Sequence, residues 1–343
     1  MNRSRPAPNG MKAISSNLKL LENQVLNINR DFLSGFEFGL GQKKDFSKKQ
    51  IIACGMGGSI LAAELLSENF SAVVKDYSLP KIKDRKNTVV FCFSYSGNTE
   101  ETLACAKEAK KLGLKTFGFS RGGKLKKIVD EFFEIPDFKL PRFAVPYWLG
   151  LVRGLLSPRR GSGSTLSPLN GLTKKLDKIK LNIKQVVGQA EALAKKLQGK
   201  KVIIYSPGRL EPLAHFWEVN LDETSKVPSF VSTLPDADHH DIASFSQPRL
   251  TRSKNSPGKD FAAIFLDDNS FLKKRTELTA GIFKRRLKID AVILRNNQTN
   301  RLSKILNHLL LAYLTSLVLA RYYRVNPFEN FLQEKLKKDL NKK

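Results

Sequence analysis

QIIACGMGGS at residues 50–59 and TVVFCFSYSGNTEET at residues 88–102 decide the fold of this chain. In both stretches a short apolar run, rich in β-branched or aromatic residues, passes through small and hydroxyl-bearing residues into a segment that favours helix. Strands followed by helices form parallel sheets, because two parallel strands need a crossover connection between them. The two stretches therefore predict a parallel sheet that is covered by helices on both faces.

The alternation of strands and helices extends outward from these stretches. We predict an amphipathic opening helix at 17–33, helices at about 59–69 and 99–112, and further strands at 71–77, 115–120 and 131–135. The pattern restarts after SPRRGSGSTLSP at 157–168, with a Lys-rich helix to about 199 and strands at 201–207, 229–233, 261–266 and 290–295. This predicts two tandem α/β domains, at 1–156 and 157–343, each a doubly wound parallel sheet flanked by helices. The polar segment between them fits either a flexible linker or a surface insertion.

The dominant bulk feature is a formal net charge of +27, from 59 Lys and Arg against 32 Asp and Glu. Such a charge is compatible with nucleic-acid binding. However, the basic residues lie on helix-like polar faces, without interleaved aromatic residues and without a helix-turn-helix, zinc-finger or RNA-recognition pattern. A solvated basic surface is therefore the favoured interpretation, and nucleic acid is not an expected partner. A basic field would also attract an anionic substrate.

Hydropathy and cysteine content indicate a cytoplasmic protein. No stretch reaches the roughly 20 apolar residues that span a bilayer, and the longest candidate, 309–320, is about half that length. The opening residues, MNRSRPAPNG, lack the apolar run of a secretion signal. The cysteines, Cys54, Cys92 and Cys105, lack metal-ligand spacing, so we expect them in the core.

The first strand-to-helix junction carries Gly57, Gly58 and Ser59. Glycines let the backbone come close to a ligand, and the start of a helix offers unpaired N–H groups with a partial positive charge, which suits a phosphate. A G-x-G-x-x-G dinucleotide fingerprint is absent, because Ile60 stands where its third glycine would be.

The second junction crowds Ser94, Ser96 and Thr99 into one turn. A helix cap needs one hydroxyl, so three suggest donors that converge on an anion held without a lysine or a metal. Both junctions follow strands, and ligands of doubly wound folds bind at the carboxyl ends of the strands.

These residues resemble a known family. GMGGS followed by SYSGNTEET is similar to the sugar isomerase (SIS) domain, in the form found in bifunctional phosphoglucose/phosphomannose isomerases. The resemblance continues at Arg142, where the family has an active-site arginine. DETSKVP (222–228) is similar to its N-E-x-x-K-V-P segment, and DHHDI (238–242) is similar to its N-H-N-[DE]-I segment. Lys335, in a predicted final helix at 325–340, matches the family's lysine. It implies two SIS domains, a homodimer and a cofactor-free isomerase of sugar 6-phosphates in glycolysis and gluconeogenesis.

The chemistry of aldose–ketose isomerisation agrees with these assignments. A proton moves between C1 and C2 through a cis-enediol, so one base must reach both carbons, and Glu223 is the candidate. His239 suits the proton transfer that opens the sugar ring, since histidine titrates near neutrality. Lys335 would hydrogen-bond to the ring oxygen, and Arg142 would stabilise the enediolate charge. The implied dimer allows His239 to act in the neighbouring subunit.

Two departures from the family and two rival interpretations accompany this assignment. Phe328 stands where the family has a threonine beside the sugar, so glucose 6-phosphate and fructose 6-phosphate are the expected substrates and mannose 6-phosphate is a second candidate. Residues 153–168 are more basic than the apolar helix that the family leads us to expect. A metal site at 239–241 is disfavoured, because adjacent histidines point in different directions. A non-catalytic sugar-phosphate sensor would need only the two turns, whereas the four candidate catalytic residues favour an enzyme.

Overall fold

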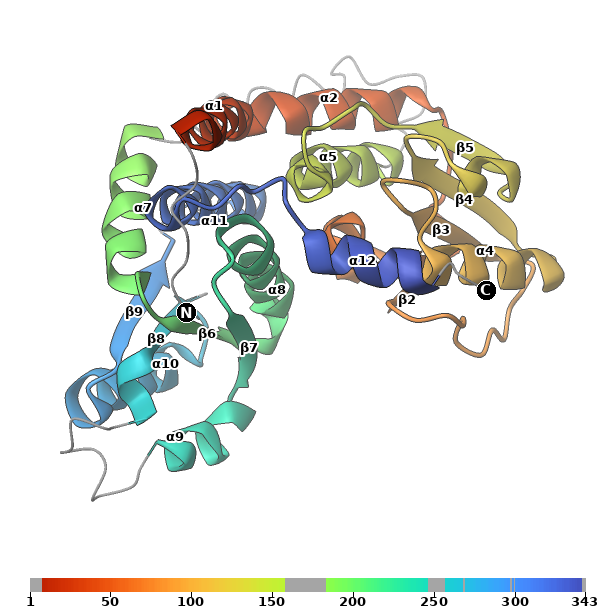
Figure 1. Ribbon diagram of the computed structural model, residues 1–343. Helices are drawn as coiled ribbons and strands as arrows, with labels where there is room; N and C mark the ends of the chain where they lie inside the picture. The colour runs from red at the N-terminus through yellow and green to blue at the C-terminus, as the bar shows by residue number, and fades with distance from the viewer. Residues whose placement is uncertain are drawn as a thin grey trace, which may run out of the picture. The chain divides into compact units, whose positions relative to one another are not determined.

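The chain divides into two units in the computed structural model, which describes residues 8–157, 183–245, 257–267, 269–296, 298 and 300–340 (Figure 1). Residues Asn27–Lys180 form one, here called the middle unit. The other, here called the split unit, combines Met1–Leu26 with Leu181–Lys343. Each unit holds one parallel sheet flanked by helices, which confirms the predicted fold class.

The sheet of the middle unit has the order β2-β1-β3-β4-β5, and all its strands are parallel. The strands are β1 (Gln50–Gly55), β2 (Ala72–Val74), β3 (Thr88–Phe93), β4 (Lys115–Ser120) and β5 (Glu131–Glu134). The helices are α2 (Ile28–Gly41), α3 (Leu61–Leu65), α4 (Glu100–Lys111) and α5 (Val145–Leu155), with short turns η1 (Gly57–Ser59), η2 (Ser67–Asn69), η3 (Lys124–Lys127) and η4 (Pro141–Ala144).

Alternating residues of the middle sheet pack against different helices. On one face, Cys54 and Cys92 pack with α4 in a cluster that includes Cys105, so the three cysteines are buried as expected. On the other face, the rings of Phe93, Phe119 and Phe133 stack in a row. Trp148 of α5 meets the Phe93 ring at 5.5 Å between centroids and joins α5 to this aromatic core.

Helices α2 and α5 touch backbone to backbone, because glycines line their contact. A Cβ built on Gly150 of α5 would lie 1.9 Å from the carbonyl oxygen of Phe32 in α2. No side chain fits into that space, so this pair of helices forms a rigid layer behind β3 and β4.

The split unit has a sheet of order β7-β6-β8-β9, again entirely parallel. Its strands are β6 (Lys201–Pro207), β7 (Ser229–Leu234), β8 (Phe261–Asp267) and β9 (Asp290–Arg295). Its helices are α1 (Pro8–Val25), α7 (Ile183–Leu197), α8 (Glu211–Asn220), α9 (Asp241–Ser244), α10 (Lys273–Ile282), α11 (Arg301–Tyr323) and α12 (Phe331–Leu340), and its short turns are η5 (Gly208–Leu210), η6 (Leu221–Ser225), η7 (Asp236–His239), η8 (Pro257–Asp260) and η9 (Phe283–Leu287).

Helix α11 lies at the centre of the helical layer of the split unit, in contact with α1, α7 and α8 (Figure 1). It is the one helix in the described part of the chain that is long and apolar enough to cross a membrane, and 78% of its most apolar window is buried inside the protein. That burial marks a core helix. The predicted half-span at 309–320 was too short, because the helix extends from Arg301 to Tyr323.

The opening helix differs from its prediction in length and in partner. The predicted helix at 17–33 is two helices, α1 and α2, and the chain passes from the split unit to the middle unit where they meet. Asn17 of α1 donates to Asn326 Oδ1 at 3.3 Å, and Glu22 pairs with Arg321 at 3.0 Å. Helix α1 thus belongs with the C-terminal part of the chain, whereas the sequence grouped it with residues 1–156. The predicted boundary at 156/157 borders 158–182, which lie outside the described residues.

Candidate active site

The first turn of the middle unit follows β1 directly and packs against Arg142. Gly57 has a φ of +50°, a left-handed conformation that favours glycine. A Cβ on Gly58 would lie 3.0 Å from the Cα of Arg142 in η4, so this position has almost no room for a side chain. The turn and the backbone that carries Arg142 are therefore in direct contact.

The second turn follows β3 and is organised around Ser94. The Ser94 hydroxyl is fully buried, accepts from the N–H of Gly97 at 3.1 Å and shares a hydrogen bond of 2.8 Å with the Thr99 hydroxyl. Gly97 has a φ of +68°, and a Cβ there would meet the carbonyl oxygen of Gly122 at 1.8 Å. Ser96 remains exposed, and its hydroxyl accepts from the N–H of Asn98 at 3.2 Å.

A hydrogen bond joins the two turns. The buried Ser59 hydroxyl accepts from the backbone N–H of Tyr95 at 3.0 Å. Among the six residues predicted to bind phosphate, Ser59 and Ser94 thus use their side chains inside the protein. The exposed Ser96 and the half-buried Thr99 lie nearer to solvent.

Tyr95 is a positioning residue that the sequence did not single out. Its hydroxyl accepts from the N–H of Phe138 at 2.6 Å and donates to the carbonyl oxygen of the same residue at 2.6 Å. Burial raises the pKa of Tyr95 to about 12, so the hydroxyl keeps its proton at neutral pH. These bonds hold the segment that leads into η4. The signal was a large aromatic residue in the middle of a turn otherwise made of small polar residues.

Arg142 is 2% exposed, which is rare for an arginine. Its guanidinium carbon lies 5.5 Å from the centre of the Phe143 ring. An arginine stays charged even when buried, so the residue whose backbone packs on the first turn also carries a positive charge. The middle unit therefore combines two glycine-containing turns with a buried cation, an arrangement suited to an anion.

Glu223 lies in the split unit, on η6, a short π-helical turn that continues α8. Single π-turns of this kind occur often at functional sites. Lys226 ends the turn with a φ of 58°, and its ammonium group donates to the Glu223 carbonyl oxygen at 2.7 Å. The same ammonium donates to Asn330 Oδ1 at 2.7 Å, just before α12 begins. The Glu223 turn is thereby tied to the helix that carries Lys335.

Asp222 fixes the other side of the Glu223 turn. Its Oδ1 accepts from both the N–H and the hydroxyl of Ser229, each at 2.9 Å. Burial raises the pKa of Asp222 to about 6, although the two bonds from Ser229 act to lower it. The neighbouring Glu223 side chain is half-buried.

His239 and Lys335 both lie at exposed positions of the split unit. His239 ends η7, and the neighbouring Asp238 anchors this turn to α10 through Arg275 at 3.0 Å and Thr279 at 2.8 Å. His240 instead pairs with Asp241, with 2.6 Å between Nδ1 and Oδ1. Lys335 lies on α12, which starts at Phe331 rather than at the predicted residue 325.

Within the described residues, no group of three or more His, Cys, Asp or Glu side chains is arranged to hold a metal ion.

The predicted site residues divide between the units as follows. The two turns and Arg142 belong to the middle unit, and Glu223, His239 and Lys335 belong to the split unit.

Comparison with known proteins adds the family. Residues 187–340 match the bacterial phospho-glucose isomerase C-terminal SIS domain. The chain is 28% identical to a bifunctional phosphoglucose/phosphomannose isomerase of Aquifex aeolicus, over 93% of this chain and 99% of the relative. Over nearly its whole length, this chain is therefore similar to the bifunctional phosphoglucose/phosphomannose isomerases. This confirms the resemblance found in the sequence.

Two further similarities are to proteins whose names refer to amino-sugar phosphates. A D-glucosamine-6-phosphate 4-epimerase of Sulfolobus acidocaldarius is 31% identical over 58% of this chain and 64% of its own length. A crystal structure of glucosamine-6-phosphate deaminase from Thermotoga maritima has a TM-score of 0.63 at 14% identity, covering 91% of this chain and 96% of the other. The second likeness concerns the fold alone.

Proposed function

We propose that the protein is an aldose–ketose isomerase that interconverts glucose 6-phosphate and fructose 6-phosphate through a cis-enediol. The observation that carries the proposal is the joined pair of turns in the middle unit. The Ser59–Tyr95 hydrogen bond links the turns, and Gly58 packs on the backbone of the buried Arg142. Backbone N–H groups, hydroxyls and one fixed guanidinium are the donors that hold a phosphate dianion without a metal.

The proposed roles follow from the chemistry that each group can perform. Glu223 is the base that removes the proton from one carbon and returns it to the next, and its turn is fixed by Lys226 and Asp222. His239 transfers the proton that opens the sugar ring, with Lys335 at the ring oxygen. Arg142 stabilises the negative charge of the enediolate.

A coupled assay tests this function directly. Purified protein is given fructose 6-phosphate, glucose 6-phosphate is measured, and mannose 6-phosphate is supplied in a parallel reaction. We expect Glu223→Gln to lower kcat by at least about 100-fold, since a proton-transfer group is lost. Glu191→Gln, on the exposed face of α7 in the same unit, is the matched control and should keep full activity.

Two outcomes would overturn the proposal. If wild type and Glu223→Gln are equally inert while fructose 6-phosphate still binds, the protein is a sugar-phosphate sensor. Glucosamine 6-phosphate is supplied in a further reaction. If the protein converts it to its C4 epimer and does not interconvert the aldose and ketose phosphates, the chemistry is that of the similar epimerase.

We further propose that the protein is a homodimer in which His239 serves the neighbouring subunit. Mixing the inactive variants His239→Ala and Glu223→Gln tests this proposal. If His239 acts in trans, each mixed dimer contains one site with both wild-type residues, so random exchange should restore about a quarter of the wild-type activity. If it acts in its own subunit, every site lacks one residue and the mixture stays inactive.

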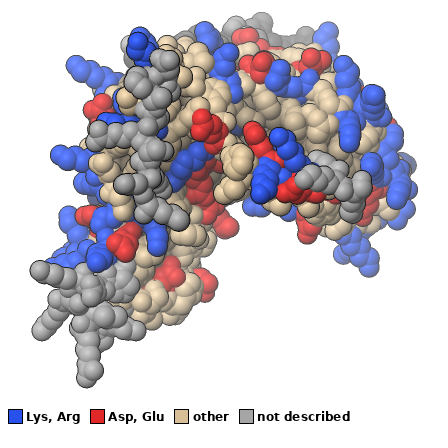
Figure 2. All heavy atoms as spheres, viewed as in Figure 1, with Lys and Arg blue, Asp and Glu red and all other residues tan. Residues whose placement is uncertain are grey.

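The charges on the face drawn in Figure 2 do not favour nucleic-acid binding. Figure 2 shows Lys and Arg side chains scattered over the visible face, with Asp and Glu side chains among them. A nucleic-acid site would instead gather its cations along a groove or stripe.

A further inference from the structure

A cavity of about 310 Å³ opens at the amino ends of β3 and β4, in the middle unit. Its wall includes Thr88 and Val89 at the start of β3 and Lys115 at the start of β4. The two turns of the candidate active site follow the opposite, carboxyl ends of β1 and β3. A strand of six residues spans about 20 Å, so one strand length separates this cavity from those turns.

Five cationic side chains line this cavity, against one acidic residue, Asp45. They come from three separate segments of the chain: Lys44, Lys49, Arg85, Lys86 and Lys115. Surface lysines usually spread apart, because crowding like charges into one concave wall costs free energy. A cavity that collects them therefore has a field suited to an anion.

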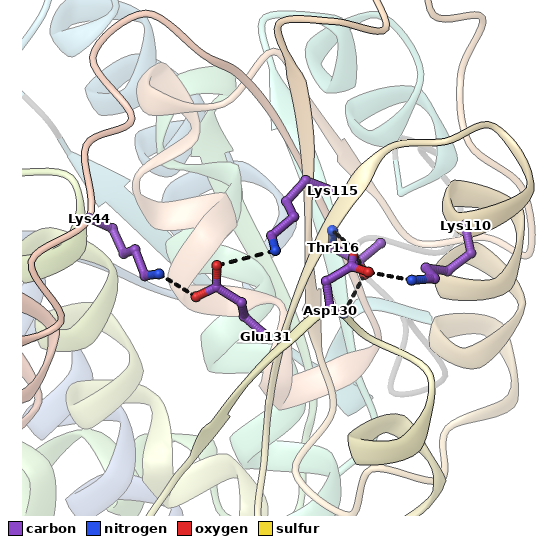
Figure 3. Close-up of polar contacts among 6 residues, drawn as sticks. All are labelled: Lys44, Lys110, Lys115, Thr116, Asp130 and Glu131. Carbon is purple, nitrogen blue, oxygen red and sulfur yellow. Dashed lines mark hydrogen bonds and ion pairs between the residues drawn. The ribbon is translucent and has the colours of Figure 1, made fainter.

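Glu131 neutralises part of this charge from the edge of the cavity (Figure 3). Its carboxylate lies between the ammonium groups of Lys44, at 2.5 Å, and Lys115, at 3.4 Å. The neighbouring Asp130 is engaged elsewhere, with Lys110 and Thr116. Asp84, whose charge interacts with that of Lys49, also lies close to this wall. With Asp45, Glu131 and Asp84 counted against the five cations, a net charge of two positive remains.

Arg85 and Lys86 differ from the other cations of the wall, because Lys49 has a neighbouring carboxylate in Asp84. Lys49 donates to the carbonyl oxygen of Lys86 at 3.3 Å. Arg85 and Lys86 are exposed, and in the described part of the chain neither side chain has a hydrogen-bond or ion-pair partner. These two groups are free to meet a ligand.

The remaining wall is aromatic. Phe46 and Phe117 line the cavity, and their rings meet edge to face with 5.2 Å between centroids. Both rings are buried, so they form an apolar floor beside the cationic side chains. A rigid apolar floor with a few charged groups around it is typical of small-ligand sites, and the volume lies at the low end of their range.

We propose that this cavity binds a small anion that carries two or more linked phosphate groups, either an inorganic polyphosphate or the polyphosphate of a nucleotide. Five cations from three segments of the chain offer more contacts than a single phosphate can use. The cavity is too small to admit a nucleic-acid duplex. The site is separate from sugar-phosphate isomerisation, which belongs to the carboxyl ends of the strands.

Calorimetric titration with inorganic tripolyphosphate, and with ATP in a second arm, tests the proposal at about 150 mM salt. We expect Arg85→Ala with Lys86→Ala to weaken binding by at least about tenfold, because two unpaired cations are removed. The matched control removes the same charge from the exposed face of α4, by Lys107→Ala with Lys111→Ala, and should change affinity by less than about twofold.

A third variant gives a result in the opposite direction. Glu131→Gln removes the carboxylate that competes for Lys44 and Lys115, so it should tighten tripolyphosphate binding severalfold. A diffuse basic surface would also gain affinity from this change, but it would lose equal affinity in the two double variants. Equal losses in both double variants would therefore overturn the proposal.

Further readouts separate this site from the catalytic one and test what it recognises. The Arg85 and Lys86 double variant should keep its isomerase kcat/KM, since neither residue is assigned to catalysis. Displacement of tripolyphosphate by fructose 6-phosphate would place the anion in the catalytic site and refute a separate one. The proposal would also be refuted if tripolyphosphate does not bind at about 1 mM. The same holds if tripolyphosphate does not bind but duplex DNA is retained in a way that depends on Arg85. Equal affinity for tripolyphosphate and ATP would show that the site recognises the phosphates alone. Tighter binding of ATP would show that the aromatic floor also contacts the nucleoside.

Discussion

His308 makes the split unit sensitive to mild acid. It lies inside α11, is 4% exposed, and its Nδ1 is buried without a hydrogen-bond partner among the described residues. Burial, together with the smaller effect of the Lys304 charge one turn earlier, lowers the pKa of His308 from 6.5 to about 4. The folded protein therefore resists protonation of a group that the unfolded chain protonates readily.

The size and sign of the effect follow from linkage. Between pH 6.5 and pH 4 the unfolded chain binds more protons than the folded one, so the free energy of unfolding falls as the pH falls. Each pKa unit corresponds to about 1.4 kcal/mol, which gives a loss of about 3 kcal/mol below about pH 4, where both states are protonated. At pH 5 the expected loss relative to pH 7.5 is about 2 kcal/mol.

Urea unfolding of wild type and His308→Leu at several pH values measures this effect. The chain has one tryptophan in each unit, so Trp217 fluorescence in a Trp148→Phe background reports on the unit that contains His308. Subtracting the variant cancels the titration of every other group. We expect the difference between the two proteins to shift by about 2 kcal/mol in favour of the variant between pH 7.5 and pH 5. Parallel pH profiles would refute the reasoning.

Three other predictions concern the candidate site. Gly58→Ala should lower kcat/KM by at least about tenfold in the coupled assay, because its Cβ would lie 3.0 Å from the Cα of Arg142. A rate within twofold of wild type would contradict the close packing. Tyr95→Phe removes both bonds to Phe138 and should cost about 1–3 kcal/mol in urea unfolding followed by Trp148 fluorescence; an unchanged midpoint would remove its positioning role. Phe328→Thr should raise the rate with mannose 6-phosphate relative to that with glucose 6-phosphate, because the smaller side chain opens space beside the sugar. An unchanged ratio of the two rates would count against a role of Phe328 in excluding mannose 6-phosphate.

The strands were largely predictable from the sequence, because their signal is local. The runs at 50–55, 115–120 and 201–207 coincide with β1, β4 and β6, where apolar, β-branched residues stand between turn residues. Helix ends were less accurate. The final helix begins at Phe331 and not at 325, because Asn326 accepts from the N–H of Phe328 at 3.2 Å and holds the preceding residues in a turn.

The roles of individual hydroxyls could not be predicted from spacing. Ser59, Ser94 and Ser96 look equivalent in the sequence, yet Ser59 joins the two turns, Ser94 organises its own, and only Ser96 is exposed. Which hydroxyl turns inward depends on the register between neighbouring strands, here β1 and β3, which no local pattern contains. The partner of α1 was hidden for the same reason, since Asn17 and Asn326 are separated by 309 positions.

That separation has a consequence for biosynthesis. A ribosome releases Asn27–Lys180 as an uninterrupted segment, so the middle unit can fold while the rest is still being made. Helix α1 is made before the middle unit, but it must wait for Arg321 and Asn326 before its buried leucines are covered. A fragment that starts after the middle unit would therefore lack one wall of its core, and it should regain that wall when α1 is supplied as a separate peptide or by circular permutation.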